Sequence, residues 1–167
     1  MEFRKTKIED ILNVLTIINQ AKSYFKEKEI DQWQSGYPNR QSIEEDILKS
    51  HSYVLILNNR IVGTSAISFE GEKTYNKIYK GEWLTHESYG VIHRIAVDSN
   101  LKGQGLASII LKNVEKLSID KDIHSIKMDT HKDNLSMQKL LKKNDFKYCG
   151  IIFLEDGNER VAFEKNF

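Results

Sequence analysis

The sequence has little cysteine, proline or glycine, and each scarcity excludes a class of protein. Its single cysteine, Cys149, cannot form an internal disulfide or a cysteine-based metal site, so nothing indicates an oxidising compartment. One proline and nine glycines leave no room for a collagen-like repeat or a long linker. Apolar runs such as Val54–Leu57 are far shorter than the roughly 20 residues that span a membrane. We therefore expect a soluble, cytoplasmic protein without a membrane partner.

Excess charge of one sign is also lacking. The formal net charge is +1, from 25 basic and 24 acidic residues, which disfavours a nucleic-acid-binding protein. The charge is uneven, however, because residues 102–147 contain ten lysines and six acidic residues. This local excess suits a small anionic ligand better than a polyanion, although a solvated helix face can carry the same pattern without any ligand.

The length of 167 residues matches one domain, and no repeat or boundary interrupts it, so we expect a single domain over residues 1–167. Periodicity predicts strands near residues 1–6, 53–57, 61–69, 89–97, 124–129, 146–154 and 161–167, and helices near 8–25, 42–49, 107–117 and 135–143. Ser42 and Glu45 have the spacing of a capping box, and Gly63 is a candidate β-bulge. An early antiparallel hairpin followed by a strand–helix–strand unit predicts a mixed sheet with helices, an α/β or α+β fold.

A glycine-containing turn leads from one predicted strand directly into a predicted helix. The turn is Lys102-Gly103-Gln104-Gly105, and Leu106 and Ala107 follow it. Glycine lets the backbone approach an oxyanion closely, and the first N–H groups of a helix have no partner within the helix. The turn therefore predicts an anion site, most simply for phosphate. The alternative is a turn that precedes a helix and binds nothing.

Three kinds of phosphate loop can be compared with this turn. A P-loop is excluded because no Lys-Ser or Lys-Thr pair closes the required glycine frame. The dinucleotide fingerprint shares Gly103 and Gly105, with Ser108 at its third glycine and Asp129 as a candidate ribose ligand. That fold requires several successive parallel strand–helix units, whereas these glycines follow an antiparallel hairpin. An NAD-dependent oxidoreductase is therefore the weaker alternative.

The third kind matches best. Lys102, Gly105 and Ala107 resemble the acyl-coenzyme A binding motif of the GCN5-related N-acetyltransferase (GNAT) family, which reads Arg or Gln, two residues, Gly, one residue, Gly or Ala. Asn134 and Phe146 resemble the family's second motif, in which an Asn opens a helix that ends just before a Phe. The resemblance implies the acyl-CoA N-acyltransferase fold: a single-layer, mixed, mostly antiparallel, splayed sheet of about seven strands with helices on both faces.

The same resemblance implies acetyl-CoA as the acyl-donor cosubstrate and no metal. Backbone groups of Ile95 and Val97 would pair with the pantetheine arm, and an N–H near Ile95 or Ala96 would contact the oxyanion. Asn134 would contact the arm from the other side, with helix capping as its alternative role. The residues expected around the pyrophosphate are Lys102, Gly103, Gln104, Gly105, Leu106, Ala107 and Ser108.

Acetylation of an amine requires a base, because an alkylammonium with a pKa of about 10 must lose a proton at neutral pH. His93 is the first candidate, and weaker candidates are Glu82, Glu87, Asp129 and His131. The family's tyrosine, which protonates the departing thiolate, aligns with Leu141, so Tyr148 is the candidate substitute. Cys149 lies in a β-run without a local His–Asp pair, which disfavours a covalent acyl-enzyme.

The acceptor is expected to be a small-molecule primary amine, with a peptide or protein amine as the less favoured choice. Trp33, Tyr37 and Trp83 are candidate walls of its pocket, although ordinary aromatic packing explains each of them as well. A non-catalytic sensor of acyl-CoA is the second hypothesis, because the usual tyrosine is missing. A homodimer is left open.

Overall fold

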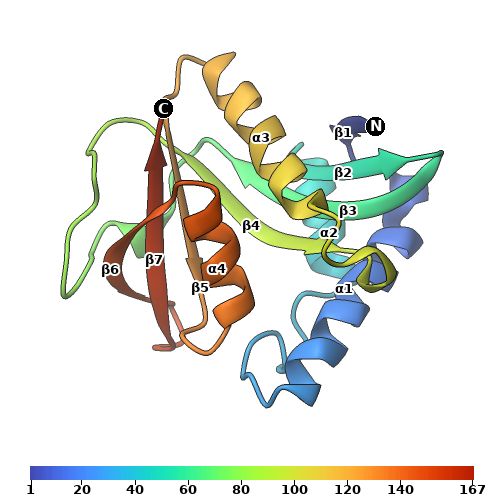
Figure 1. Ribbon diagram of the computed structural model, residues 1–167, viewed down its shortest axis with the longest axis horizontal. Coiled ribbons are helices and arrows are strands. Elements are labelled where there is room, and N and C mark those ends of the chain that lie inside the picture. Colours follow the sequence, from blue (N-terminus) through green and yellow to red (C-terminus); the bar gives the residue numbers. More distant parts are fainter. The chain divides into compact units, whose positions relative to one another are not determined.

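The computed structural model describes residues 1–167 and contains seven strands in one mixed sheet, together with four α-helices (Figure 1). The strands are β1 (Glu2–Lys5), β2 (Ser52–Leu57), β3 (Arg60–Ser68), β4 (Gly90–Val97), β5 (Ser125–Thr130), β6 (Lys147–Phe153) and β7 (Glu159–Asn166). The helices are α1 (Ile11–Glu27), α2 (Arg40–Leu48), α3 (Leu106–Ile119) and α4 (Leu135–Lys143), and 3₁₀ turns are η1 (Ile8–Asp10), η2 (Lys73–Tyr75) and η3 (Ser99–Leu101).

The strands are hydrogen-bonded in the order β1-β2-β3-β4-β5-β7-β6. β4 and β5 are parallel, whereas β1–β2, β2–β3, β5–β7 and β6–β7 are antiparallel. This confirms the predicted mixed, mostly antiparallel sheet of seven strands. None of the helices combines the length and the apolar character needed to cross a bilayer.

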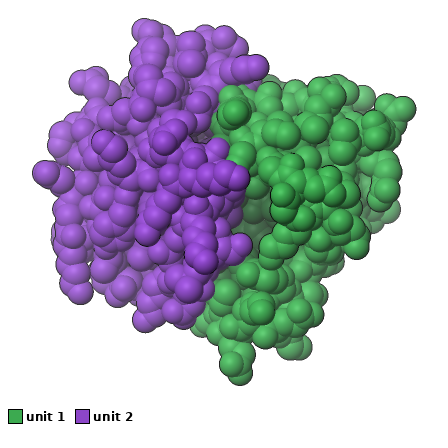
Figure 2. Space-filling view, in the orientation of Figure 1, with its two compact units in different colours: residues 1–67, 94–113 green, residues 68–93, 114–167 purple.

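The chain forms two compact units, which are coloured separately in Figure 2. Unit 1 comprises residues 1–67 and 94–113, and unit 2 comprises residues 68–93 and 114–167. β4 and α3 contribute residues to both units. The single domain expected over residues 1–167 stays a prediction.

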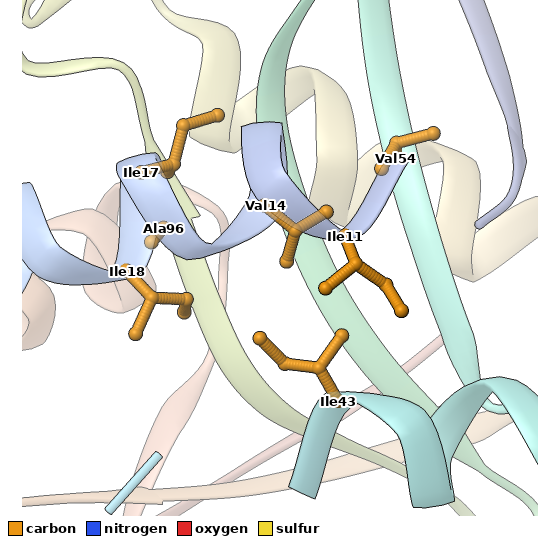
Figure 3. Close-up of a cluster of buried hydrophobic side chains, with 7 residues drawn as sticks. All are labelled: Ile11, Val14, Ile17, Ile18, Ile43, Val54 and Ala96. Atoms are coloured by element: carbon orange, nitrogen blue, oxygen red, sulfur yellow. The ribbon is translucent and has the colours of Figure 1, made fainter. Parts of the chain in front are cut away.

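The core of unit 1 forms on the apolar face of α1. Ile11, Val14 and Ile18 recur at helical spacing on that face, and they pack with Ile43 of α2 and Val54 of β2 (Figure 3). All five side chains are at most 3% exposed. The periodic pattern of the sequence therefore identified this face, because apolar residues three and four positions apart lie on one side of a helix.

The β2–β3 hairpin turns on two residues. Asn58 and Asn59 have φ values of 49° and 59°, the left-handed conformation that a two-residue turn needs to match the twist of its strands. The expected bulge at Gly63 is confirmed, because Leu55 opposes Gly63 and Ile56 opposes Ile61, which leaves Val62 of β3 as the extra residue beside the glycine. Gly63 permits a close approach: a Cβ there would lie 2.9 Å from Cδ1 of Ile110.

The start of α2 also differs from the expectation. The helix begins at Arg40, and Asn39 rather than Ser42 is its N-cap. Oδ1 of Asn39 accepts a hydrogen bond from the Ser42 N–H (3.0 Å), and Oγ of Ser42 accepts one from the Asn39 N–H (2.9 Å). Ser42 therefore completes the capping box that Asn39 opens, while Glu45 is bound to Gln41 one turn before it (3.0 Å).

Unit 2 is built on β5, β7 and β6 with the first residues of β4. The parallel pairing of β4 with β5 is short, because Gly90 and Val91 oppose Ile126 and Lys127. The segment of residues 69–89 that precedes β4 has little regular structure, as the sequence predicted, apart from η2 and an isolated bridge between Tyr79 and Ile151. That irregular segment supplies several of the side chains described below.

Truncating a buried side chain of α1 tests the unit 1 core. Ile18→Ala should lower the free energy of unfolding by about 2–5 kcal/mol, because Ile18 is 1% exposed and its removal leaves a cavity. Leu12→Ala on the same helix is the matched control, since Leu12 is 69% exposed, and it should change stability by less than about 0.5 kcal/mol. Urea unfolding followed by circular dichroism measures both, and equal losses would contradict the packing of Figure 3.

Candidate active site

The glycine turn of unit 1 has an open backbone. Gly103 and Gly105 have φ values of 87° and 78°, which other residues rarely adopt. A Cβ built on either residue would meet no atom within 4 Å, so the space beside the turn is open. The glycines are therefore required by the conformation of the turn and not by packing against the protein.

The first turn of α3 presents N–H groups next to these glycines. The N–H of Ile109 donates to the carbonyl of Gly105 (3.1 Å), so the N–H groups of Leu106 and Ala107 precede the first intrahelical bond. The approach to the turn is fixed by Asp98, which caps η3 by accepting from the Asn100 N–H (3.0 Å). An exposed, glycine-lined backbone with unpaired donors fits a diphosphate group.

Lys102 contributes a positive charge at the same turn. Its Nζ lies 3.6 Å from the ring centroid of Tyr24 on α1, which is a close cation–π contact. Lys102 stands where the family motif has Arg or Gln, and its charge is fixed beside the turn by a residue of unit 1.

Arg94 interrupts β4 between the candidate base and the candidate cofactor-binding residues. Its φ is 52°, outside the β region, so the expected alternation of Val91, His93, Ile95 and Val97 on one face does not continue through it. The Arg94 guanidinium donates to both carboxylate oxygens of Asp46 (2.9 and 2.6 Å) and to the hydroxyl of Tyr37. Ile95 and Ala96 follow, each 8% exposed.

The aromatic candidates of unit 1 are both anchored to their own unit. Trp33 is partly buried, and its ring meets the edge of Phe25 at a centroid distance of 5.4 Å. Tyr37 is 43% exposed and its hydroxyl binds Arg94. Both residues lie between α1 and α2 in the sequence.

In unit 2, His93 is paired with a carboxylate. Nε2 of His93 lies 3.1 Å from Oε2 of Glu72, and both side chains are about 30% exposed (30% and 27%). Oε1 of Glu72 accepts from the N–H and the hydroxyl of Thr74 (3.2 and 3.0 Å). The hydrogen bond from His93 is the main reason that the pKa of Glu72 falls from the usual 4.5 to about 2, so the carboxylate is ionised at neutral pH.

A second pair lies beside the first. The hydroxyl of Tyr75 donates to Oδ1 of Asp129 (2.6 Å), and the Tyr75 ring lies 6.4 Å from the His93 ring. Burial, and then the charge of Asp129, raise the pKa of Tyr75 well above its usual value, so the phenol stays neutral. Tyr75 thus joins His93 of β4 to Asp129 of β5.

The structure brings together two residues that the sequence singled out, His93 and Asp129, around two that it did not, Glu72 and Tyr75. No periodic pattern marks Glu72, because it lies in the irregular segment before β4. The available signal was weak: the aromatic residues Tyr75, Tyr79 and Trp83 are frequent in a segment that is otherwise polar.

The remaining candidates lie in varied environments. Tyr148 is 50% exposed on β6, with its ring edge against Phe163. Leu141 is fully buried. Its aliphatic side chain has no hydroxyl that could donate a proton. Burial raises the pKa of Cys149 to about 11, so its thiol is protonated. Trp83 is 7% exposed, and its Nε1 donates to the carbonyl of Tyr75 (2.8 Å).

Two details of the second motif have a local explanation. Oδ1 of Asn134 accepts from the Met137 N–H (3.1 Å), so Asn134 is the N-cap of α4. Asp145 follows the C-cap with a φ of 67°, the left-handed conformation that glycine adopts at no cost. The weaker base candidates Glu82 and Glu87 are exposed, and Nδ1 of His131 accepts from the Asp133 N–H (3.1 Å).

The pairing of Glu72 predicts a pH-dependent stability. Because its pKa is lower in the folded protein, Glu72 contributes stability above about pH 4.5 that is lost as the pH falls toward 2. The difference in unfolding free energy between the wild type and Glu72→Gln should therefore be largest near neutral pH and shrink below about pH 4. Urea unfolding at several pH values measures it. Glu87→Gln, at an exposed position, is the control, and a pH-independent difference for Glu72→Gln would contradict the pairing.

Known proteins of one family share the fold of this chain. No match was found among curated protein sequences. The profile described as "Acetyltransferase (GNAT) family" matches residues 17–146.

Three solved structures are similar to this chain. A GNAT-family acetyltransferase structure from Streptococcus agalactiae 2603 is 31% identical with a TM-score of 0.91, and the match covers 99% of this chain and 95% of that chain. A candidate acetyltransferase from Staphylococcus aureus Mu50 is 26% identical with a TM-score of 0.75, covering 99% of both chains. A ribosomal-protein-alanine N-acetyltransferase from Brucella melitensis, 15% identical with a TM-score of 0.70 over 100% of both chains, shares the fold. The chain belongs to the GNAT family of acetyltransferases.

Proposed function

We propose that this acetyltransferase moves an acetyl group from acetyl-CoA to the primary amine of a small molecule, as a single N-acetyltransferase domain over residues 1–167, with His93 as the general base. The observation that carries the proposal is the hydrogen bond between His93 and Glu72 (3.1 Å), next to Asp129 and Tyr75. A histidine held by an ionised carboxylate is suited to accept a proton at neutral pH.

Acetyl-CoA is the usual acyl donor of the GNAT family, and the turn at Gly103–Gly105 fits its diphosphate. When bound, acetyl-CoA supplies the acetyl group as an activated thioester. We assign the diphosphate to the backbone of the turn and of the first residues of α3, with the charge of Lys102 beside it. The other proposed contacts are the backbone of β4 at Ile95, Ala96 and Val97, and Asn134 at the start of α4.

His93 has one ring nitrogen available for proton transfer. When Nε2–H donates to Glu72, the lone pair on Nδ1 is left to take a proton from the acceptor ammonium. Glu72 fixes the ring orientation and stabilises the imidazolium that forms. Glu72 is a positioning residue in this scheme, because it acts on the substrate only through His93.

The carboxylate of Asp129 supports an amine as the acceptor. Asp129 is partly exposed, and Tyr75 occupies only Oδ1, so Oδ2 can bind an ammonium group. Trp33 and Tyr37 stay candidate contacts of the acceptor. Because Leu141 provides no hydroxyl, the proton for the departing thiolate is assigned to Tyr148 or to water.

Leu141 also favours one other candidate function, a sensor that binds acyl-CoA without turnover. Calorimetric titration with coenzyme A, acetyl-CoA and NAD, followed by a thiol-release assay over small amines and peptides, separates the two. The enzyme binds the first two ligands and releases thiol with at least one amine. A sensor binds them and releases none, and binding of NAD alone would reject both.

Replacing the proposed base tests the mechanism. His93→Gln should lower kcat/KM for the amine by about 10²–10⁴-fold, the usual contribution of a general base. Acetyl-CoA affinity should be unchanged. His124→Gln is the control, because His124 also lies beside a carboxylate, Asp122 (3.3 Å), at an exposed site. Unaltered kinetics of His93→Gln would reject this assignment.

Replacing a glycine of the turn tests the cofactor site. Gly105→Val should weaken acetyl-CoA binding by about tenfold or more, because valine at a φ of 78° forces the turn to rearrange and at least one N–H contact is lost. Gly157→Val is the matched control, since Gly157 has a φ of 82° and equally open surroundings in the β6–β7 turn. Both variants carry the same backbone strain, so equal affinities by calorimetry would refute the site.

A further inference from the structure

The irregular segment of residues 69–89 carries Glu72 and Tyr75, yet few backbone hydrogen bonds to strands hold it. One such link is the bridge between Tyr79 and Ile151. A carboxylate that positions a base needs a fixed backbone, because a displacement of about 1 Å can reduce a rate by 10²-fold. The question is which contacts fix this segment.

Lys127 of β5 is one contact. It is 3% exposed, and its Nζ donates to the carbonyl of Thr85 (3.1 Å). The same Nζ lies 4.0 Å from the ring centroid of Tyr89 and 4.6 Å from that of Trp83. The ammonium therefore lies against aromatic rings and a carbonyl of the irregular segment, which stabilise a cation that has little access to water.

Glu164 of β7 is the second contact. It is fully buried and stands directly opposite Lys127 in the antiparallel register. Its Oε2 accepts from the N–H of Leu84 (2.6 Å), and its Oε1 accepts from the hydroxyl of Ser125 (2.7 Å). Glu164 thus binds the N–H of Leu84, and Lys127 binds the carbonyl of Thr85, the next residue of the irregular segment.

A continuous chain of contacts joins these two charges to the proposed base. Trp83, which lies against Lys127, donates from Nε1 to the carbonyl of Tyr75, and the two rings are 5.2 Å apart. The N–H of Tyr75 donates to the carbonyl of Glu72 (2.9 Å) across η2. The Glu72 carboxylate then binds His93.

We infer that Lys127 and Glu164 form a positioning clamp, which binds the Leu84–Thr85 backbone and so holds Glu72 against His93. The inference rests on the proposed function of that pair. Apolar side chains would bury this face at lower electrostatic cost, because each buried charge must be compensated. A charged side chain can instead bind one particular backbone group. The clamp therefore fixes the position of the Leu84–Thr85 backbone, which apolar packing would not do.

A double-mutant cycle tests the clamp. Lys127→Met should lower kcat/KM for the amine by about 10- to 100-fold without changing acetyl-CoA affinity. Glu72→Gln should then cost far less in the Lys127→Met background than in the wild type, because residues that act through one contact are not additive. A lysine with only a structural role would give additive losses, and that result would overturn the inference.

Lys165→Met is the matched control. Lys165 forms another partly buried ion pair of unit 2, and its partner Glu115 (2.5 Å) belongs to α3 rather than to the irregular segment. Lys165→Met should lower the stability of the protein but leave kcat/KM for the amine unchanged. In the double variant with Glu72→Gln, the kinetic loss should equal that of Glu72→Gln alone. Equal kinetic effects of Lys127→Met and Lys165→Met would also overturn the inference.

A second measurement needs no turnover. The NMR signals of the His93 ring should shift, and the Leu84 amide should exchange faster, in Lys127→Met but not in Lys165→Met. Unchanged signals reject the clamp, whereas a wild type that acetylates no amine rejects the proposed function alone. If Lys127→Met does not fold, Trp83→Phe replaces it in the cycle, because it removes the hydrogen bond to the Tyr75 carbonyl and shortens the ring that lies against Lys127, and additivity there rejects the clamp.

Discussion

The hydrogen bond between His93 and Glu72 is the interaction on which the proposed chemistry depends, because it joins a regular strand to a segment with almost no regular structure. The main chain of β4 is fixed next to His93 by the pairing of Val91 with Lys127. Glu72 has no such support and lies beside a single 3₁₀ turn. The carboxylate can orient the imidazole only if side-chain contacts fix the backbone that carries it, and the proposed role of Lys127 and Glu164 is to supply such contacts.

The parts of the fold and site that could be predicted from the sequence are those set by local pattern. Apolar residues at helical spacing identified the buried face of α1, and two β-rich runs close together in the sequence identified the β2–β3 hairpin. The turn at Gly103 and Gly105 was identified because its glycines stand directly before a predicted helix, and the structure adds that both have a positive φ. His93 was named because it lies on a strand that precedes this turn, and the start of the strand has a readable pattern.

The parts that could not be predicted depend on contacts between distant segments. In β5, polar Ser125, Lys127 and Asp129 alternate with apolar residues, a pattern typical of a strand with one solvent-exposed face. In the structure that face is covered, because Lys127 reaches the carbonyl of Thr85, 42 residues earlier in the chain. Contacts between a side chain and a remote backbone group leave no period in the sequence, so Glu72 and Tyr75 could not be found from it.

In each unit one basic side chain of a strand binds a segment that is distant in the sequence, α2 in unit 1 and the irregular segment in unit 2, but the chemistry of the two contacts differs. Arg94 uses the planar guanidinium, which binds both oxygens of Asp46 and thereby fixes orientation as well as distance. Lys127 provides a point charge, so its direction depends on the aromatic rings and the carbonyl around it.

The anchor at Arg94 also stabilises an unfavourable backbone. A left-handed residue with a Cβ costs about 1–2 kcal/mol, and the bidentate pair with Asp46, whose side chains are 17% and 13% exposed, can offset a cost of that size. The residue lies between His93 and Ile95, so the strand loses its two-residue alternation between the proposed base and the proposed cofactor contacts.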